Sequence, residues 1–135
     1  MSDYAVSRGQ VSTGIVLDDS GDRATVFSGG TANMTVVTVG ILTISSGGTA
    51  NDTTVNRTGA LVKVCSGGIA NFTTINSGGV HVYSGGTAND TVLNHGGEMY
   101  VFAGGTASIL FTTPWGGTVG IDSGATVTFL RDAKV

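Results

Sequence analysis

Aromatic side chains are the residues of this chain most suited to binding chemistry, because acidic, basic and metal-binding groups are few. Phe27, Tyr83 and Phe102 each come directly before a Ser-Gly-Gly or Ala-Gly-Gly turn, and Tyr100 lies two residues before Phe102. Exposed aromatic rings stack on sugar rings and on other proteins. We therefore predict that these four residues form a strip that binds a ligand or partner. Ordinary packing of bulky rings against one another is the alternative.

Catalytic groups are not arranged for a reaction. Glycoside hydrolysis needs two carboxylates about 5–9 Å apart, yet Asp52 and Asp90 are separated by a whole repeat that carries Phe72 at the same place. His81 and His95 are 14 residues apart and make no metal pair. We predict that the chain is not an enzyme and needs no cofactor.

One acidic cluster and one cysteine remain to be explained. Asp18, Asp19 and Asp22 surround Ser20-Gly21, and oxygen-rich loops of this kind can hold calcium. An irregular polar turn between two coils explains the same residues and is the preferred reading. Cys65 is alone, which excludes an internal disulfide and a cysteine-based metal site. Its position predicts an exposed thiol.

These side chains are positioned by a repeat. Ser-Gly-Gly-Thr-Ala-Asn occurs three times, and variants of it occur three times more, with separations of 18, 20, 18, 19 and 20 residues between first glycines. A fixed period of this size indicates units that bury their apolar faces only by stacking on their neighbours. The first glycines of the six copies are Gly29, Gly47, Gly67, Gly85, Gly104 and Gly124.

Apolar residues alternate with variable ones before each glycine turn, which is the period of a strand with one buried face. The second residue before the motif is always Val or Ile, and the fourth is always apolar: Val26, Ile44, Val64, Val82, Val101 and Ile121, with Ala24, Leu42, Val62, Val80, Met99 and Val119. Between them lie variable residues that we predict to face solvent, among them Lys63, His81 and Tyr100.

A second strand is predicted after each turn, with alanine where the wall must bend, and it ends at a second glycine corner such as Gly40 or Gly59. The period is thus two strands and two corners, and the sequence predicts an all-β parallel β-solenoid of about seven coils with repeats of about 19 residues. Pro114 is predicted to mark a distorted corner.

Asparagine recurs in two columns of the second strand. Amides stacked about 4.8 Å apart hydrogen-bond along the axis as a ladder, and this is the reading we prefer. Five asparagines also match the acceptor pattern for N-glycosylation, but the repeat itself generates four of these matches. The columns are Asn33, Asn51, Asn71 and Asn89, and Asn56, Asn76 and Asn94.

Composition narrows the class of protein. The 135 residues make one domain, in which 40% hydrophobic content and strict periodicity exclude disorder. A net charge of −3 without a basic cluster disfavours nucleic acid as a partner, and no apolar stretch approaches the length of a membrane helix.

We expect a single solenoid over 1–135, with a cap-like first coil at 1–27, regular repeats at 28–122 and a partial last coil at 123–135. No export signal is recognised, and the chain is expected to be a piece of a longer repeat protein.

The pattern Ser-Gly-Gly-Thr-Ala, two residues, Thr-x-Val-Asn-x-Gly-Gly resembles the AIDA-type repeats of bacterial autotransporter passengers and related surface proteins. Asn51 to Ser66 and Asn89 to Val101 are nearest to type, and the resemblance runs from about Gly21 to Asp122. It implies a right-handed β-solenoid that lies outside the cell, on a bacterial surface, and serves adhesion, autoaggregation or biofilm formation as a non-catalytic rigid module.

The resemblance also implies partners. Surface glycans or proteins and other copies of the chain are candidates, and a glycosyltransferase is another because Ser and Thr in some relatives carry heptose. Candidate acceptors are Thr43, Ser45, Thr31, Thr49 and Thr87. The alternative function is carbohydrate binding by the aromatic strip. Ice binding is disfavoured because the threonine column Thr35, Thr53, Thr73 and Thr91 is predicted to face inward.

Overall fold

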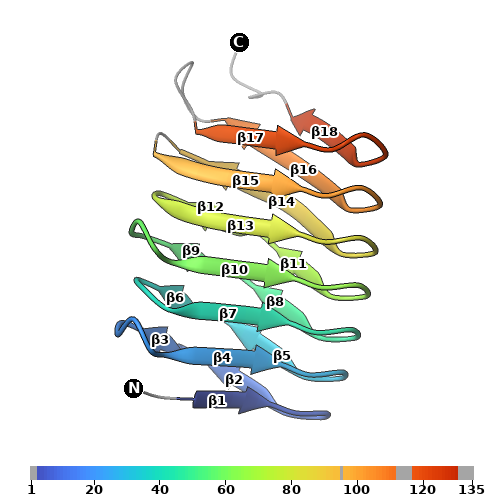
Figure 1. Cartoon of the computed structure of the whole chain (residues 1–135). Helices are drawn as coiled ribbons and strands as arrows, with labels where there is room; N and C mark the ends of the chain where they lie inside the picture. The colour runs from blue at the N-terminus through green and yellow to red at the C-terminus, as the bar shows by residue number, and fades with distance from the viewer. Residues whose placement is uncertain (1–2, 95, 112–116, 131–135) are drawn as a thin grey trace.

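The chain folds into a parallel β-solenoid whose coils stack along one axis (Figure 1). The structure is a computed structural model that describes residues 3–94, 96–111 and 117–130, and these residues contain strands and turns but no helix. In Figure 1 the near strands run to the right and the chain rises as it returns behind them, so the coil is right-handed. The predicted all-β class and right-handed solenoid are confirmed.

Two sheets form the walls. We call the seven-stranded wall sheet A; it contains, in order, β1 (Asp3–Val6), β4 (Arg23–Val26), β7 (Ile41–Ile44), β10 (Leu61–Val64), β13 (Gly78–Val82), β15 (Gly97–Val101) and β17 (Thr118–Ile121). The eleven-stranded wall is sheet B; it contains β2 (Val11–Thr13), β5 (Thr31–Asn33), β8 (Thr49–Asn51), β11 (Ile69–Asn71), β14 (Thr87–Leu93), β12 (Thr74–Ile75), β9 (Thr54–Val55), β6 (Val36–Val37), β3 (Val16–Leu17), β16 (Thr106–Phe111) and β18 (Thr126–Leu130).

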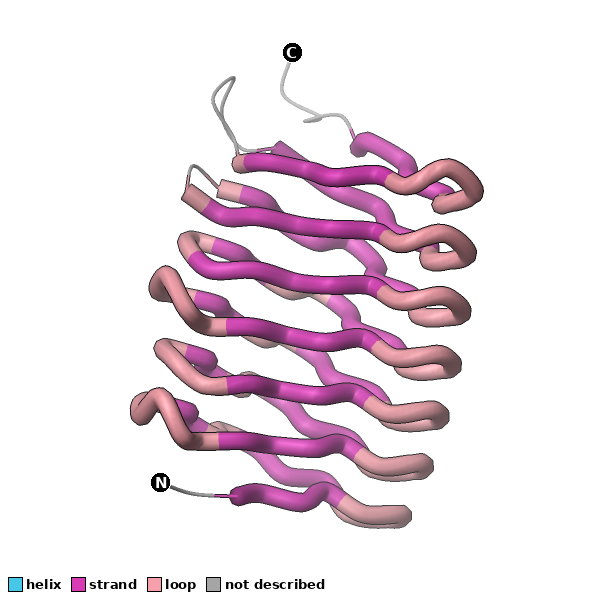
Figure 2. Tube along the Cα trace, viewed as in Figure 1, coloured by secondary structure: helices cyan, strands magenta, loops and turns pink. Residues whose placement is uncertain are grey.

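Each strand pairs in parallel with the equivalent strand of the next coil, so equivalent residues form columns. Val62 of β10 pairs with Leu42 and with Val80, for example, and Lys63 pairs with Thr43 and with His81. Strands of one sheet are therefore far apart in sequence but adjacent in space, and the loops gather at the two edges (Figure 2).

The inward columns of sheet A and sheet B make one continuous core. Val64, Val82 and Val101 are completely buried, as predicted, and a register one residue away would have turned each of them to solvent. Ile121, predicted for the same column, is 47% exposed because β17 is the last strand of sheet A. Fully buried aliphatic side chains from sheet B meet them from the opposite wall: Leu17, Val37, Val55, Ile75 and Leu93. The first coil joins both sheets in this register through β1, β2 and β3. The division into cap, regular repeats and last coil stays a prediction.

The second strand of the period differs from the prediction. In most coils it is broken into two short strands, such as β8 and β9, at a residue with positive φ. That residue is Asp52 in this coil, with φ 59°, and it lies two positions after the alanine at which we placed the bend. Because Asn51 and Asp52 both point outward, the inward alternation restarts at Thr53. Strict period-two counting cannot reproduce such a bend.

The glycine pair of the motif makes a type II β-turn. The Gly30 amide donates to the Phe27 carbonyl at 2.8 Å, and Gly29 has φ 79°, a left-handed value that this turn requires at its third residue. The next glycine is needed for space, since a Cβ on Gly48 would lie 2.5 Å from the Val26 carbonyl oxygen of the preceding coil. The predicted second corners at Gly40 and Gly59 also have positive φ; Pro114 lies outside the described residues.

Asparagine ladders run along both predicted columns. Asn51 donates its side-chain amide to Asn33 at 3.0 Å, and the bond repeats up the column to Asn89. In the second column Asn76 donates to Asn56 at 2.9 Å and Asn94 donates to Asn76 at 2.7 Å. The amides that match the N-glycosylation pattern are thus engaged in structural hydrogen bonds, which confirms the ladder interpretation.

Candidate functional site

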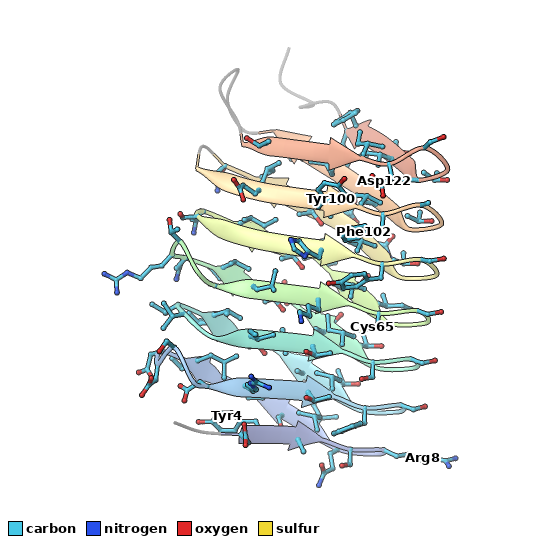
Figure 3. All side chains as sticks on the ribbon, in the orientation of Figure 1. Tyr4, Arg8, Cys65, Tyr100, Phe102 and Asp122 are labelled. Atoms are coloured by element: carbon cyan, nitrogen blue, oxygen red, sulfur yellow. The ribbon has the colours of Figure 1, made fainter. Side chains whose placement is uncertain are left out.

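The four predicted aromatic residues do not form one strip. Tyr100 lies in β15, and Tyr83 and Phe102 directly follow β13 and β15, where the three rings contact one another. Phe27 lies three coils away from Tyr83, separated from it by the Ser45 and Cys65 positions of its column. Figure 3 shows Tyr100 and Phe102 near one another on the outer face of sheet A.

His81 completes this group, and we call His81, Tyr83, Tyr100 and Phe102 the aromatic cluster. The Tyr83 and Phe102 rings are stacked with centroids 4.9 Å apart and planes within 3°. Tyr100 and Phe102 centroids are 4.6 Å apart, and the His81 ring meets Phe102 edge-on at 5.9 Å. Several ring faces are therefore occupied by other rings, so the packing alternative holds for part of the strip. The outermost surface belongs to Tyr100, which is 39% exposed.

Tyr100 is held by the next coil. Its hydroxyl donates to the Asp122 carboxylate at 2.8 Å, and its ring covers Gly120, where a Cβ would lie 2.6 Å from the ring. The hydrogen bond to Asp122, followed by the negative charge of that carboxylate, raises the pKa of Tyr100 above its ordinary value. The absence of a side chain at Gly120 thus fixes where the tyrosine ring rests.

Two hollows adjoin the cluster. One of about 240 Å³ is lined by His81, Glu98, Tyr100, Thr118 and Gly120. Another of about 280 Å³ lies on the other side of His81 and Glu98, over Gly79. A carboxylate, an imidazole, a hydroxyl and an aromatic ring here converge on one small space, which is the mixture of groups that orients a polar ligand.

The charge of His81 is set by its surroundings. Partial burial, and then the positive charge of Lys63 on the neighbouring coil, lower the pKa of His81, while Glu98 acts in the opposite direction. The lowered pKa favours the neutral imidazole, which offers one donor and one acceptor. Such a group hydrogen-bonds a ligand hydroxyl in either direction.

The predicted acceptor hydroxyls all face outward. Thr43 and Ser45 lie on the outer face of sheet A, and Thr31, Thr49 and Thr87 form part of an outer column of sheet B. All five are half-buried, because the neighbouring coils flank them. The serines of the type II turns are more exposed, and our sequence prediction omitted them although they recur in the motif: Ser28, Ser46, Ser66, Ser84 and Ser123.

The acidic cluster forms a turn. The Asp22 side chain is buried, and its carboxylate accepts hydrogen bonds from the backbone amides of Asp18 and Asp19 at 3.1 and 3.2 Å. Asp19 accepts in turn from the Gly21 amide at 3.3 Å. These bonds account for the residues as a polar turn. Within 3–94, 96–111 and 117–130 no three His, Cys, Asp or Glu side chains are grouped to hold a metal ion, and the calcium reading stays a prediction.

The outer columns face outward, as predicted, but several of their side chains are less exposed than we expected. Cys65, predicted as an exposed thiol, is only half-buried, and Lys63 and His81 are half-buried too. Stacked coils shield each other's outer side chains. The threonine column that includes Thr53 and Thr91 is fully inside, as predicted, and cannot form an ice-binding face.

The chain is similar to a solved structure. No protein-family model matches the chain, and no curated protein matches it. The crystal structure of a TibC-catalysed, hyper-glycosylated TibA fragment (residues 55–350) is similar, with a TM-score of 0.75 and 36% sequence identity over 81% of this chain. The chain spans 42% of that fragment. It is thus a β-solenoid of the same kind as the TibA fragment. The described residues contain no helix that is long and apolar enough to cross a membrane.

Proposed function

We propose that this chain is a rigid, non-catalytic repeat module of a bacterial surface adhesin and that a glycosyltransferase attaches sugars to its outer hydroxyls. The observation that carries the proposal is the 36% identity and shared fold with a fragment whose solenoid is hyper-glycosylated by TibC. The outer columns and turns of this chain offer hydroxyls at regular intervals along the axis, including Thr31, Thr49 and Ser46.

The repeat suits such a role physically. Parallel pairing, inward aliphatic columns and asparagine ladders repeat in each coil, so the module is stiff along its axis. Its outer columns vary without affecting the core, so acceptors and contact residues can change freely. Display at the cell surface, adhesion, autoaggregation and biofilm formation are the activities that we infer for it.

Co-expression with TibC tests the proposal. The chain should gain mass in increments of one sugar, and cells that display the modified chain should adhere or aggregate more than cells that display the unmodified chain. A variant with alanine at all five candidate acceptors, the four threonines and Ser45, should gain fewer sugars. A chain that gains no sugar under conditions in which TibA is glycosylated would contradict the glycosylation part of the proposal, and displaying cells that neither adhere nor aggregate would contradict the adhesin part.

Carbohydrate binding by the aromatic cluster is the second candidate, and the hollow beside Tyr100 and Glu98 favours it. A sugar ring placed on the exposed part of Tyr100 would have Glu98, His81 and Thr118 within the same hollow to hydrogen-bond its hydroxyls. A glycan array with the unmodified chain is the test. Tyr100→Ala should abolish any signal, whereas Phe27→Ala, which removes an exposed ring three coils away, should retain it. Equal loss in both variants would count against the hollow.

A further inference from the structure

The bend of sheet B carries a row of residues that the fold itself does not explain. Met34, Asp52, Phe72 and Asp90 occupy the bend in four successive coils, and we call them the bend row. In Figure 1 the row follows β5, β8 and β11 on the far wall and lies within β14 in the fourth coil. All four have left-handed backbone, with φ of 55°, 59°, 57° and 55°. All four side chains are exposed.

Met34 and Phe72 are unfavourable choices at such a position. Aspartate tolerates left-handed backbone because its short side chain bonds locally, but a methionine or phenylalanine gains no such bond. Burial does not compensate, since Met34 is 60% exposed and Phe72 is 58% exposed. Neither backbone preference nor core packing therefore accounts for these two apolar side chains. Contact with something outside the chain would account for them.

The two apolar side chains flank a groove with a negative charge at its centre. A hollow of about 410 Å³ is lined by Met34, Phe72 and, on the coil between them, Asp52. Its floor is the outer face of β6, β9 and β12, which presents Val36, Thr54 and Thr74 in adjacent positions. The Asp52 carboxylate makes no ion pair or side-chain hydrogen bond with any residue that the structure describes.

We propose that this groove binds a lysine or arginine side chain of a partner protein. The cationic head would pair with the Asp52 carboxylate, while the aliphatic stem packs between Met34 and Phe72 and the cation approaches the Phe72 ring. Charge complementarity selects this occupant. A purely apolar ligand would cover the carboxylate without neutralising it, and a single carboxylate is a poor metal site.

The row also fixes how a partner chain lies. Asp90 follows Phe72 on the next coil, so Asp52 and Asp90 are two coils apart, roughly 10 Å at about 4.8 Å per coil. A chain in polyproline II conformation has three residues per turn and rises about 3.1 Å per residue, so its residues i and i+3 lie on the same side, about 9 Å apart. The occupant is therefore a segment in polyproline II conformation that runs along the solenoid axis, with basic residues three positions apart. This surface is on sheet B, so the proposal is independent of the aromatic cluster on sheet A.

Titration of the isotope-labelled chain with short acetylated peptides, followed by NMR, tests the proposal. The probe is a six-residue peptide of serine and threonine with lysine at positions two and five. One control peptide places the two lysines side by side, and another replaces both with glutamate. The first peptide should bind with millimolar or tighter affinity at low salt, shift the amide signals around Asp52 and Phe72, and bind best of the three.

Variants separate this groove from general charge attraction. Asp52→Asn and Phe72→Asn should each weaken the lysine peptide about fivefold or more, and asparagine keeps the left-handed backbone accessible, so both variants should fold. The matched controls Asp3→Asn and Val11→Ser remove an exposed charge and an exposed apolar side chain elsewhere, and they should bind normally.

Three results would overturn the proposal. The first is equal binding by the Asp52→Asn and Asp3→Asn variants, which would indicate attraction by net charge alone. The second is binding of spermidine at the groove without binding of either lysine peptide. The third is a concentration-dependent self-association of the unliganded chain that Asp52→Asn abolishes, because the occupant would then be a second copy of this chain.

Discussion

Replacing Thr53 with valine should stabilise the solenoid, because the threonine hydroxyl is buried without a hydrogen-bond partner. Thr35, Thr53, Thr73 and Thr91 are 0–1% exposed, and none of their hydroxyl oxygens has a partner among the described residues. A buried polar group that loses its bonds to water without replacement costs about 1–3 kcal/mol. Valine has the same branched shape and no hydroxyl, so it removes this cost without opening a cavity.

The spacing of the buried threonines shows that their hydroxyls cannot hydrogen-bond to one another. Equivalent hydroxyls on adjacent coils are roughly 4.8 Å apart, beyond the limit for a direct hydrogen bond, so they cannot satisfy one another. We expect about 1 kcal/mol of stabilisation for Thr53→Val. Thr35→Val and Thr73→Val are two coils apart, roughly 10 Å, and their effects should add to about 2 kcal/mol in the double variant.

Urea unfolding measures the effect as a higher transition midpoint at an unchanged slope. The matched control is Thr54→Val, the next residue along the chain, whose side chain is half-buried on the outer face. It should change the free energy of unfolding by no more than about 0.5 kcal/mol. Destabilisation by Thr53→Val would refute the reasoning, since it would mean that the hydroxyl makes a favourable interaction inside the coil.

Three further predictions concern the turn, the histidine and the register. Gly48→Ala should destabilise the chain by more than about 1 kcal/mol in urea unfolding, because its Cβ would lie 2.5 Å from a carbonyl oxygen of the preceding coil. The pKa of His81 is lowered in the folded state, so as pH falls this histidine is protonated in the unfolded chain before it is protonated in the folded chain. The free energy of unfolding should therefore decrease as pH drops below about 6.5. Calorimetry across this range should show a weaker pH dependence in His81→Gln than in His95→Gln. Val82→Asp should cost several kcal/mol because it places an unpaired carboxylate in the core; Tyr83→Asp should cost about 1 kcal/mol, and equal losses of thermal stability would contradict the register.

The columns of this solenoid could be predicted from sequence because each inward position is tested once per coil. Val64, Val82 and Val101 are equivalent by spacing alone, and the same spacing placed a polar column, that of Thr53, correctly inside. The bend at Asp52 was not predictable by alternation, since two successive residues point outward there. It is a property of backbone conformation, and the residues in the bend row share no side-chain type that would mark it.

The candidate site was predicted only in part, because its contacts join residues of different columns and coils. Spacing within the repeat shows which residues share a column, and it correctly placed Tyr83 and Phe102 together. It also grouped Phe27 with them by shared position in the repeat, although the order of the repeats puts the Ser45 and Cys65 coils between Phe27 and Tyr83. The His81 ring contacts rings of neighbouring columns, and the Tyr100 ring lies over Gly120 of the next coil. Spacing along one column does not show either contact. They become visible only when neighbouring columns are placed side by side.

Mapping the sugars on the chain after co-expression with TibC tests the central claim most directly. Peptide mass spectrometry should locate sugars on outward hydroxyls such as Thr49, Ser45 and Ser46, and on none of the inward hydroxyls represented by Thr53. That pattern would show that the folded solenoid presents its outer columns as a carrier of carbohydrate. A chain that stays unmodified under conditions in which TibA is glycosylated, or one that carries sugar on Thr53, would contradict the account.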